Sequence, residues 1–280
     1  MAASLQLPAG EGVYKRQGNF AVFNQLGTKV DLNAVSDAGY FEWLDRMTAR
    51  IGSLVPGAEM VEKANGLPDS RTTPTLNTAV YYDTPDYRVL RTGALIRTSC
   101  NVITHAFCAC KLARNDHSVR KDHRFMFDGD EKRIIQASPT SPEAVAIVRR
   151  LLARKDIEHP GNYLEAHYGI RPEDLYPSMV LERYICSFFV WLDKKDALRC
   201  PMDRCYVRNL RVPKEERRRD AFKEVEFNIY PHVPAEIAGD PRVAQLIQTL
   251  TDSACEESGG RITRDIKYQR GAKALGFFPA

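Results

Sequence analysis

The sequence of 280 residues predicts a single α+β domain, mainly antiparallel β, in which a sheet closes into a barrel with helices packed outside. Three observations predict this class. At least seven strand-like stretches follow one another in meander order. Two blocks with helical spacing interrupt them. The strand-like stretches also alternate in polarity, so that their charged residues share one face. The chain has no internal repeat and no linker, and we expect one domain over residues 1–280.

The first half of the chain opens with a strand or hairpin at 13–31 and a helix at 36–54. The helix is predicted by apolar residues at helical spacing, namely Phe41, Leu44, Met47, Ile51 and Leu54. A polar stretch with prolines at 64–75 is expected to be a loop. Four strands are then predicted, at 77–83, 93–101, 103–112 and 119–127.

The second half begins with a helical insertion at about 141–176. Its first helix is expected to start at Ser141 as the N-cap, with Pro142 in the first turn. Strands are predicted at 178–192, 197–210 and 221–230. Asp240 and Pro241 open a last helix, whose inward side is predicted to carry Val243, Leu246, Ile247 and Leu250.

The composition is that of an ordinary soluble protein, with 44% hydrophobic and 27% charged residues. A net charge of +4 is too small to argue for a nucleic-acid surface. No apolar run reaches the length of a membrane span, and the first residues, "MAASLQLPAGEG", lack the basic and apolar regions of a signal peptide. We therefore expect a cytoplasmic protein that does not bind a membrane.

The seven cysteines are expected to be reduced and structural. The pairs Cys108-x-Cys110 and Cys200-x4-Cys205 do not have the spacing of a zinc site, and no histidine pair completes one. The sequence also contains no P-loop, no Rossmann fingerprint and no nucleophile elbow, which argues against those enzyme classes. The six histidines are scattered, and none is assigned a role.

One arginine raises the question of what the sheet encloses. Arg97 lies in the middle of an apolar strand, and arginine is almost never buried without a partner. Alternation puts charged side chains on the same face of the other strands. If helices cover the opposite faces, the enclosed cations are Arg97, Lys111, Arg120, Arg124, Arg183, Arg199 and Lys267. The enclosed acids are Asp122, Asp203, Glu224 and Glu226.

The surplus of positive charge in this set predicts an anionic ligand. An enclosed ion without a partner costs several kcal/mol. A triphosphate carries roughly three to four negative charges. A divalent cation held by the carboxylates would bridge its oxygens. Each strand taken alone also fits the alternative of an antiparallel sheet with one wet face.

The same residues carry a family resemblance. "YYDTPDYRVLRTGALIR" resembles the "YFDTPDL…L…G…LRIR" signature of the triphosphate tunnel metalloenzymes, the CYTH superfamily. Lys111 in "ACKL" stands where that family has the lysine of its "TLK" strand. "FKEVEFNIY" resembles its late Glu-x-Glu strand, and "IKYQRG" its closing "SKYxRG". The stretch "LYPSMVLERYICSFFVW…ALRCPMDRCYV" resembles the polyphosphate-polymerase domain of vacuolar transporter chaperones. The coverage is about 77–272.

The resemblance implies an eight-stranded antiparallel tunnel that binds Mg²⁺ or Mn²⁺ and a triphosphate or polyphosphate. It implies that the catalytic residues are Glu224, Glu226 and Lys111. The implied metal ligands are Glu224, Glu226, Asp122 and Asp203. The phosphate-binding residues it implies are Arg97, Lys111, Arg120, Arg124, Arg183, Arg199 and Lys267.

Two positions depart from the family pattern. Where the family has an N-terminal Glu-x-Glu-x-Lys strand, this chain offers Ala21, Phe23 and Gln25. The second arginine of an Arg-x-Arg pair is Ser99. These departures make phosphate recognition better supported than hydrolysis.

Several functions fit this pattern. Triphosphate hydrolysis ranks first because water needs no further binding site, with nucleotide cyclisation and polyphosphate synthesis as other reactions of such a site. The missing glutamates favour a non-catalytic sensor or binding module for polyphosphate or a nucleotide. The basic run "KEERRRDAFK" at 214–223 prompts an RNA 5′-triphosphatase, although such a run is also typical of a solvated loop.

Overall fold

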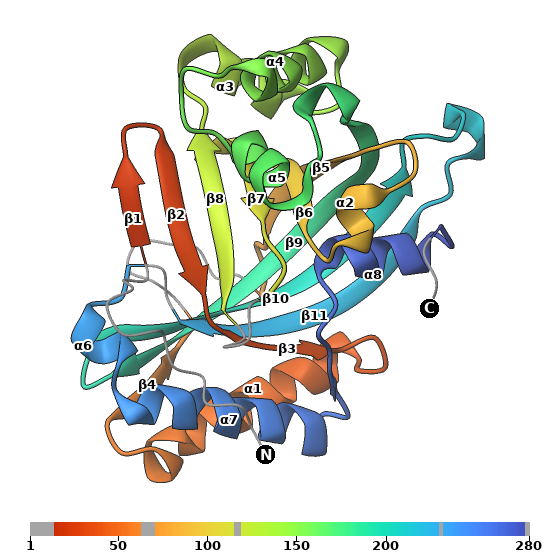
Figure 1. Cartoon of the computed structure of the whole chain (residues 1–280). Coiled ribbons are helices and arrows are strands. Elements are labelled where there is room, and N and C mark those ends of the chain that lie inside the picture. Colours follow the sequence, from red (N-terminus) through yellow and green to blue (C-terminus); the bar gives the residue numbers. More distant parts are fainter. Residues whose placement is uncertain (1–13, 63–70, 115–118, 230–231, 278–280) are drawn as a thin grey trace.

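The computed structural model describes residues 14–62, 71–114, 119–229 and 232–277 (Figure 1). Its main element is one twelve-stranded sheet in which every pair of neighbours is antiparallel. The strands are β1 (Tyr14–Gln17), β2 (Phe20–Gln25), β3 (Gly27–Asp31), β4 (Ala58–Val61), β5 (Thr75–Asp83), β6 (Leu95–Cys100), β7 (Ala106–Lys111), β8 (Arg120–Met126), β9 (Tyr176–Leu192), β10 (Lys195–Asn209), β11 (Asp220–Ile229) and β12 (Arg261–Ile262). The seven strands predicted from 77 to 230 are thereby confirmed. The expected hairpin at 13–31 is the three strands β1 to β3.

The sheet is not the closed eight-stranded barrel that we expected. Its hydrogen-bonded order is β1-β2-β8-β7-β6-β5-β9-β10-β11-β3-β12, with β4 beside β9, so the two ends are not paired with each other. The reason is a bend between β2 and β3. The first pairs with β8 and the second with β11, and only Leu26 separates them. At Gly27 an added Cβ would lie 2.2 Å from the Phe227 carbonyl oxygen, so this crossing requires glycine. The two halves of the sheet pair through β5 and β9, whereas the covalent chain at Leu26, and not a hydrogen-bonded ladder, links β2 near one end of the sheet to β3 near the other.

The helices form two groups at opposite ends of the molecule, with α3, α4 and α5 at one end and α1 and α7 at the other (Figure 1). Ser36, Ser141 and Asp240 cap α1, α4 and α7 as side-chain acceptors, which confirms the predicted starts at Ser141 and Asp240. The helices are α1 (Asp37–Leu54), α2 (Arg88–Arg91), α3 (Gly129–Ala137), α4 (Pro142–Ala153), α5 (Pro160–Tyr168), α6 (Ala235–Ala238), α7 (Pro241–Glu256) and α8 (Lys267–Ala274), with short 3₁₀ turns η1 (Pro172–Asp174) and η2 (Lys214–Glu216).

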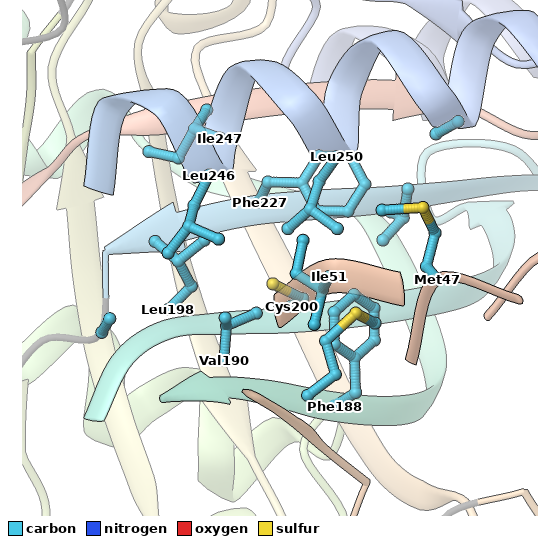
Figure 2. Close-up of a cluster of buried hydrophobic side chains, with 14 of the residues drawn as sticks. Met47, Ile51, Phe188, Val190, Leu198, Cys200, Phe227, Leu246, Ile247 and Leu250 are labelled. Carbon is cyan, nitrogen blue, oxygen red and sulfur yellow. The ribbon is translucent and has the colours of Figure 1, made fainter. Parts of the chain in front are cut away.

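The larger core lies between α1, α7 and one face of β9, β10 and β11. Figure 2 shows Leu246, Ile247 and Leu250 of α7 turned toward the sheet, with Ile51 of α1 beside them. Leu54, which we expected on the inward side of α1, is 43% exposed at the end of the helix. Trp43 of the same helix is fully buried, and its indole N–H donates to Ser253 Oγ at 2.9 Å.

A second core covers the matching face of the other half of the sheet. Ile96, Cys108 and Cys110 of β6 and β7 pack with apolar residues of α3, α4 and α5. The two cores together place helices over one face of the strands from β5 to β11. The ends of the longest strands extend past the helices. The opposite face, which carries the predicted charged residues, is turned to the inside of the bent sheet.

Two motifs far apart in the sequence close one end of this interior. The buried Asp83 carboxylate accepts the backbone N–H of Val89 at 2.8 Å and of Leu90 at 3.0 Å, so it holds α2. It also accepts the hydroxyl of Tyr268 at 2.9 Å, and the Tyr268 ring stacks on Tyr81 at 4.7 Å. The "DTP" and "KYQRG" stretches are thus one structural unit.

All seven cysteines lie within the described residues and none forms a disulfide, as expected. Six are buried, and burial raises the pKa of the Cys108 thiol to about 12. Among the helices of the described residues, none is both long enough and apolar enough to cross a membrane.

Candidate functional site

The strand register brings the predicted charged residues to one shared interior. Arg97 lies opposite Tyr81 on β5 and Ala109 on β7, and Lys111 lies opposite Asp122 on β8. In the other half of the sheet, Arg183 of β9 lies opposite Cys205 of β10, two residues from Asp203 on the same face. These side chains therefore lie on the shared face of the sheet that the alternation of the strands predicts.

Three carboxylates form one compact group, which we call the acid cluster: Asp203, Glu224 and Glu226. Asp203 of β10 lies directly opposite Glu224 of β11, and Glu226 follows two residues later on the same face. One oxygen from each lies within 4.8 Å of the others. Asp203 and Glu224 are fully buried, so the strand pairing concentrates negative charge away from water.

The acid cluster surrounds the ammonium group of Lys267, the first residue of α8. Lys267 Nζ lies 2.9 Å from Asp203 Oδ2 and 2.6 Å from Glu224 Oε1, and it also contacts Glu226 Oε1. Burial alone would raise the pKa of the Glu224 carboxyl, but Lys267 and Lys29 outweigh it and lower that pKa. The pKa of Glu226 is lowered by the same two lysines, so Glu224 and Glu226 are kept charged by lysines from α8 and β3.

The remaining oxygens of the cluster differ in their partners. Glu224 Oε2 accepts from Arg270 Nη1 at 2.6 Å, and Glu226 Oε2 accepts from the Asn228 amide at 2.7 Å. Arg270 also pairs with Asp31 at 2.9 Å. Asp203 Oδ1 is buried and has no hydrogen-bond partner within the described part of the chain. The cluster thus has one carboxylate oxygen that no neighbour satisfies.

The basic face lies on β6, β7 and β8 and consists of Arg97, Lys111, Arg120 and Arg124. Asp122, predicted as a fourth metal ligand, lies among them: it pairs with Arg124 at 2.6 Å and with Lys111 at 3.5 Å and is not part of the acid cluster. Lys111 Nζ also donates to Gln25 at 2.8 Å. Burial lowers the pKa of the Lys111 ammonium to about 7, although Asp122 acts against it.

Arg97 has no carboxylate partner among the described residues. It is 7% exposed, and its guanidinium lies over the ring of Phe107, with Cζ 5.5 Å from the centroid. Its electrostatic neighbours include the cations Arg183 and Arg124 as well as Asp122, and burial lowers its pKa. A desolvated guanidinium between like charges is costly unless a ligand compensates it.

The two other predicted cations behave differently from each other. Arg120 is 7% exposed, its Nε has no partner, and burial together with the nearby Arg114 lowers its pKa to about 10. Arg199 lies on the same face as Asp203 by register but is exposed. The structure thus brings six of the seven predicted cations into the enclosed interior and leaves Arg199 at its edge.

Three residues of the interior were missed by sequence reasoning. Lys29 lies opposite Glu226 and Asp31 opposite Glu224. The signal in the sequence is the alternation of Lys29 and Asp31 within "GTKVD", which puts both side chains on one face of β3. Arg270 stands three residues after Lys267, a spacing that puts both on one side of a helix. Ala21, Phe23 and Gln25, which stand where the family resemblance would place Glu-x-Glu-x-Lys, lie on β2 and pair with residues of β8.

A histidine that we left unassigned also faces the interior. His105 Nε2 lies 3.1 Å from the Asn77 amide, and the amide oxygen of Asn77 accepts from Ser99 at 2.8 Å. Burial, together with Arg124, Arg183, Arg97 and Arg199, lowers the pKa of His105 to about 4. His105 is therefore neutral at pH 7 in the protein alone.

No protein-family model matches the chain, and no curated protein matches it in sequence. The chain is similar to a solved structure of a candidate adenylate cyclase from Bacillus halodurans, with 12% identity, 86% of this chain and 94% of that chain covered, and a TM-score of 0.49.

Two other solved structures are similar to a comparable degree. A candidate adenylyl cyclase from Hippeastrum, described as having a dominant triphosphatase activity, gives 10% identity, coverage of 88% and 93%, and a TM-score of 0.46. A protein of Pyrococcus horikoshii gives 10% identity, coverage of 87% and 96%, and a TM-score of 0.44.

Proposed function

We propose that this protein is a divalent-metal-dependent enzyme that binds a triphosphate or polyphosphate between the basic face and the acid cluster, and that it hydrolyses a triphosphate. The observation that carries the proposal is Arg97, a buried arginine with no carboxylate partner among the described residues. A phosphate group is the ligand that best compensates an enclosed guanidinium, because charge-assisted hydrogen bonds to phosphate are short and strong.

The balance of charge supports a polyanion. Around the interior, the described cations are Lys29, Arg97, Lys111, Arg120, Arg124, Arg183, Lys267 and Arg270. The described carboxylates are Asp31, Asp122, Asp203, Glu224 and Glu226. With Lys111 charged beside a phosphate, these cations outnumber the carboxylates, and a triphosphate, which carries roughly three to four negative charges, would balance such a surplus.

The donor set fits a divalent cation. Three carboxylates offer hard oxygen ligands within 4.8 Å of one another, and the buried Asp203 Oδ1 has no other partner. Asp203, Glu224 and Glu226 would therefore hold Mg²⁺ or Mn²⁺, which when bound supplies charge neutralisation at the phosphate oxygens. The identity of the ion is part of the proposal.

The chain's own residues would act by position and charge. Arg97, Lys111, Arg124 and Arg183 would hold the phosphate oxygens and stabilise the negative charge that develops during phosphoryl transfer. Lys111 is suited to this role because its pKa of about 7 would rise beside a phosphate, so the lysine becomes charged when the substrate binds. Water would then attack the terminal phosphorus, the P–O bond to the bridging oxygen would break, the diphosphate portion would leave, and a proton of the water would pass to the solvent as phosphate is released.

The test is a phosphate-release screen. Inorganic triphosphate, thiamine triphosphate and nucleoside triphosphates are each incubated with the purified protein, with and without Mg²⁺ or Mn²⁺. We expect release from at least one triphosphate, dependent on the metal and lost in Arg97→Met. Arg149→Met serves as the matched control, because Arg149 stacks on Tyr176 at 4.8 Å and is exposed on α4. Release without metal, or equal release by both variants, would contradict the proposal.

A non-catalytic binding module is the second candidate. It is favoured by β2, which places Ala21, Phe23 and Gln25 opposite β8 and so contributes no carboxylate to the interior. Calorimetric binding of inorganic triphosphate with no phosphate release from any substrate in the screen would support this module over the enzyme. Calorimetry and phosphate release with inorganic polyphosphate in place of triphosphate test whether the protein binds the longer chain, as a polyphosphate polymerase would.

The basic run at 214–223 gives less support to an RNA 5′-triphosphatase. Arg217 donates to the carbonyls of Leu210 and Val212 at 3.0 Å, and Arg218 donates to the Ala274 carbonyl at 3.0 Å. Lys223 pairs with Asp37 at 2.8 Å. These side chains hold the surrounding loops and the start of α1, which is a structural use of the charges.

A further inference from the structure

Lys267 has a bonding pattern that conflicts with a simple role as a phosphate ligand. An ammonium group has three N–H donors and no acceptor. All three donors are engaged by the acid cluster, at 2.9 Å to Asp203, at 2.6 Å to Glu224 and in a close contact to Glu226. Lys267 cannot keep these three contacts and also bind a phosphate oxygen.

The same contacts stand in the way of a divalent cation. Mg²⁺ and Mn²⁺ need carboxylate oxygens close to the ion, at about 2.0–2.1 Å for Mg²⁺. The oxygens that could bind it, Asp203 Oδ2, Glu224 Oε1 and Glu226 Oε1, are those that Lys267 Nζ contacts. Two positive groups cannot share these oxygens at such distances, because they repel each other strongly in a buried site.

The second oxygens do not offer a full alternative. Arg270 Nη1 takes Glu224 Oε2 at 2.6 Å, and the Asn228 amide takes Glu226 Oε2 at 2.7 Å. Of the six carboxylate oxygens in the cluster, Asp203 Oδ1 is the one without a partner among the residues that the structure describes. A cation that enters the cluster must therefore displace Lys267, and Lys267 needs another anion to pair with when it leaves.

A phosphate bound at the basic face would be that anion. Lys267 Nζ shares an oxygen with Arg183, one of the proposed phosphate ligands: the two cations contact Asp203 Oδ2 at 2.9 Å and 3.3 Å. The ring of Tyr268, the next residue of α8, stacks on Tyr81, which lies opposite Arg97. The ammonium at the start of α8 and the unpaired guanidinium of Arg97 thus border the same interior.

We infer that Lys267 takes the place of the divalent cation in the ligand-free protein and moves to the phosphate when a triphosphate binds, so that cation and triphosphate bind cooperatively. This inference rests on the proposed function, and it specifies the order in which that site fills. Because coupling is reciprocal, the triphosphate must tighten the cation by the same factor by which the cation tightens the triphosphate.

The experiment measures Mn²⁺ binding without any phosphate, by calorimetry and by electron paramagnetic resonance of free Mn²⁺. We expect Lys267→Met to bind Mn²⁺ at least tenfold more tightly than the wild type, because the competing ammonium is gone. The control is Lys273→Met on the same helix, since Lys273 pairs with Asp265 at 2.8 Å and not with the cluster. It should bind Mn²⁺ like the wild type.

Removal of Lys267 leaves three enclosed carboxylates without their main counter-ion, and the variant could unfold for that reason. Thermal melting of the Lys267→Met variant with and without Mn²⁺ shows whether the variant is folded and whether Mn²⁺ stabilises it. Mn²⁺ should raise the melting temperature of Lys267→Met more than that of the wild type, and it should restore an unfolded variant. Mn²⁺ affinity equal to that of the wild type, or a variant that stays unfolded with Mn²⁺, overturns the inference.

Failure of the inference and failure of the proposed function give different results. If the wild type binds neither inorganic triphosphate nor Mn²⁺ in its presence, the proposed function is wrong. If the wild type binds both and Lys267→Met gains no affinity for Mn²⁺ alone, only the inference about Lys267 is wrong.

Discussion

The substitution Arg97→Met tests whether this buried arginine serves a ligand or the fold. Methionine keeps roughly the length of the side chain and removes the charge. In the ligand-free protein, the change removes a cation that lies near Arg183 and Arg124 and has no carboxylate partner in the ranges that the structure describes. Replacing a buried ion by a well-packed apolar group is often neutral or stabilising.

The magnitude follows from the contacts of Arg97. Its contact with the Phe107 ring, with Cζ 5.5 Å from the centroid, is worth about 2 kcal/mol at a desolvated site, and relief from the neighbouring cations offsets that loss. We expect the melting temperature of the empty protein to hold or to rise. For a triphosphate, we expect at least tenfold weaker binding, about 1.4 kcal/mol, as is typical for loss of a charge-assisted contact.

The assay is thermal melting of both proteins with and without inorganic triphosphate. At a ligand concentration of one hundred times the wild-type Kd, the ligand stabilises the wild type by about 2.7 kcal/mol and a tenfold weaker variant by about 1.4 kcal/mol. The ligand-induced rise in melting temperature should therefore fall by about half. A variant that melts far below the wild type when empty, with an unchanged ligand-induced rise, would identify Arg97 as a structural residue and refute the reasoning.

Three further predictions follow from the same contacts. Glu226→Gln should abolish metal-dependent phosphate release and weaken Mn²⁺ binding while circular dichroism stays unchanged; full turnover in this variant would show that Glu226 is not a metal ligand. Because burial lowers the pKa of Lys111 to about 7, triphosphate binding at pH 8 should take up protons and weaken as the pH rises. Calorimetry in two buffers of different ionisation enthalpy measures this uptake, which Lys111→Met should reduce, and equal heats in both buffers would argue against it. Leu250→Ala, at a fully buried position of α7, should lower the free energy of unfolding in urea by about 2–5 kcal/mol, and a loss below about 1 kcal/mol would mean that this core is loosely packed.

The faces of the strands could be predicted from the sequence alone. Alternation along a strand is a local property, because successive side chains must point to opposite faces. Arg97, Lys111 and Glu226 were therefore assigned to the inner face before any strand was paired. The helix starts at Ser141 and Asp240 were equally local, since a side-chain acceptor is needed where the first backbone N–H groups have no partner.

The tertiary structure alone decided which of these residues meet. The bend at Leu26 and Gly27 sends one continuous segment from β8 to β11, and this is what places Lys29 opposite Glu226. Nothing in the local sequence fixes that crossing, because it depends on how closely a glycine backbone can approach a strand about two hundred residues away. The same holds for the expected barrel, which remains an open ladder because the bent segment pairs with a different strand on each side.

The acid cluster shows the same division most clearly. The sequence determined that Glu224 and Glu226 share a face of their strand. It also predicted that Lys267 is an enclosed cation that binds phosphate. Only the packing of α8 against the sheet, held by Tyr268 and Asp83, brings the ammonium of Lys267 between the carboxylates. Contacts between residues distant in the chain depend on the whole arrangement of the core, so residue spacing can predict which side chains are available and cannot predict which of them become partners.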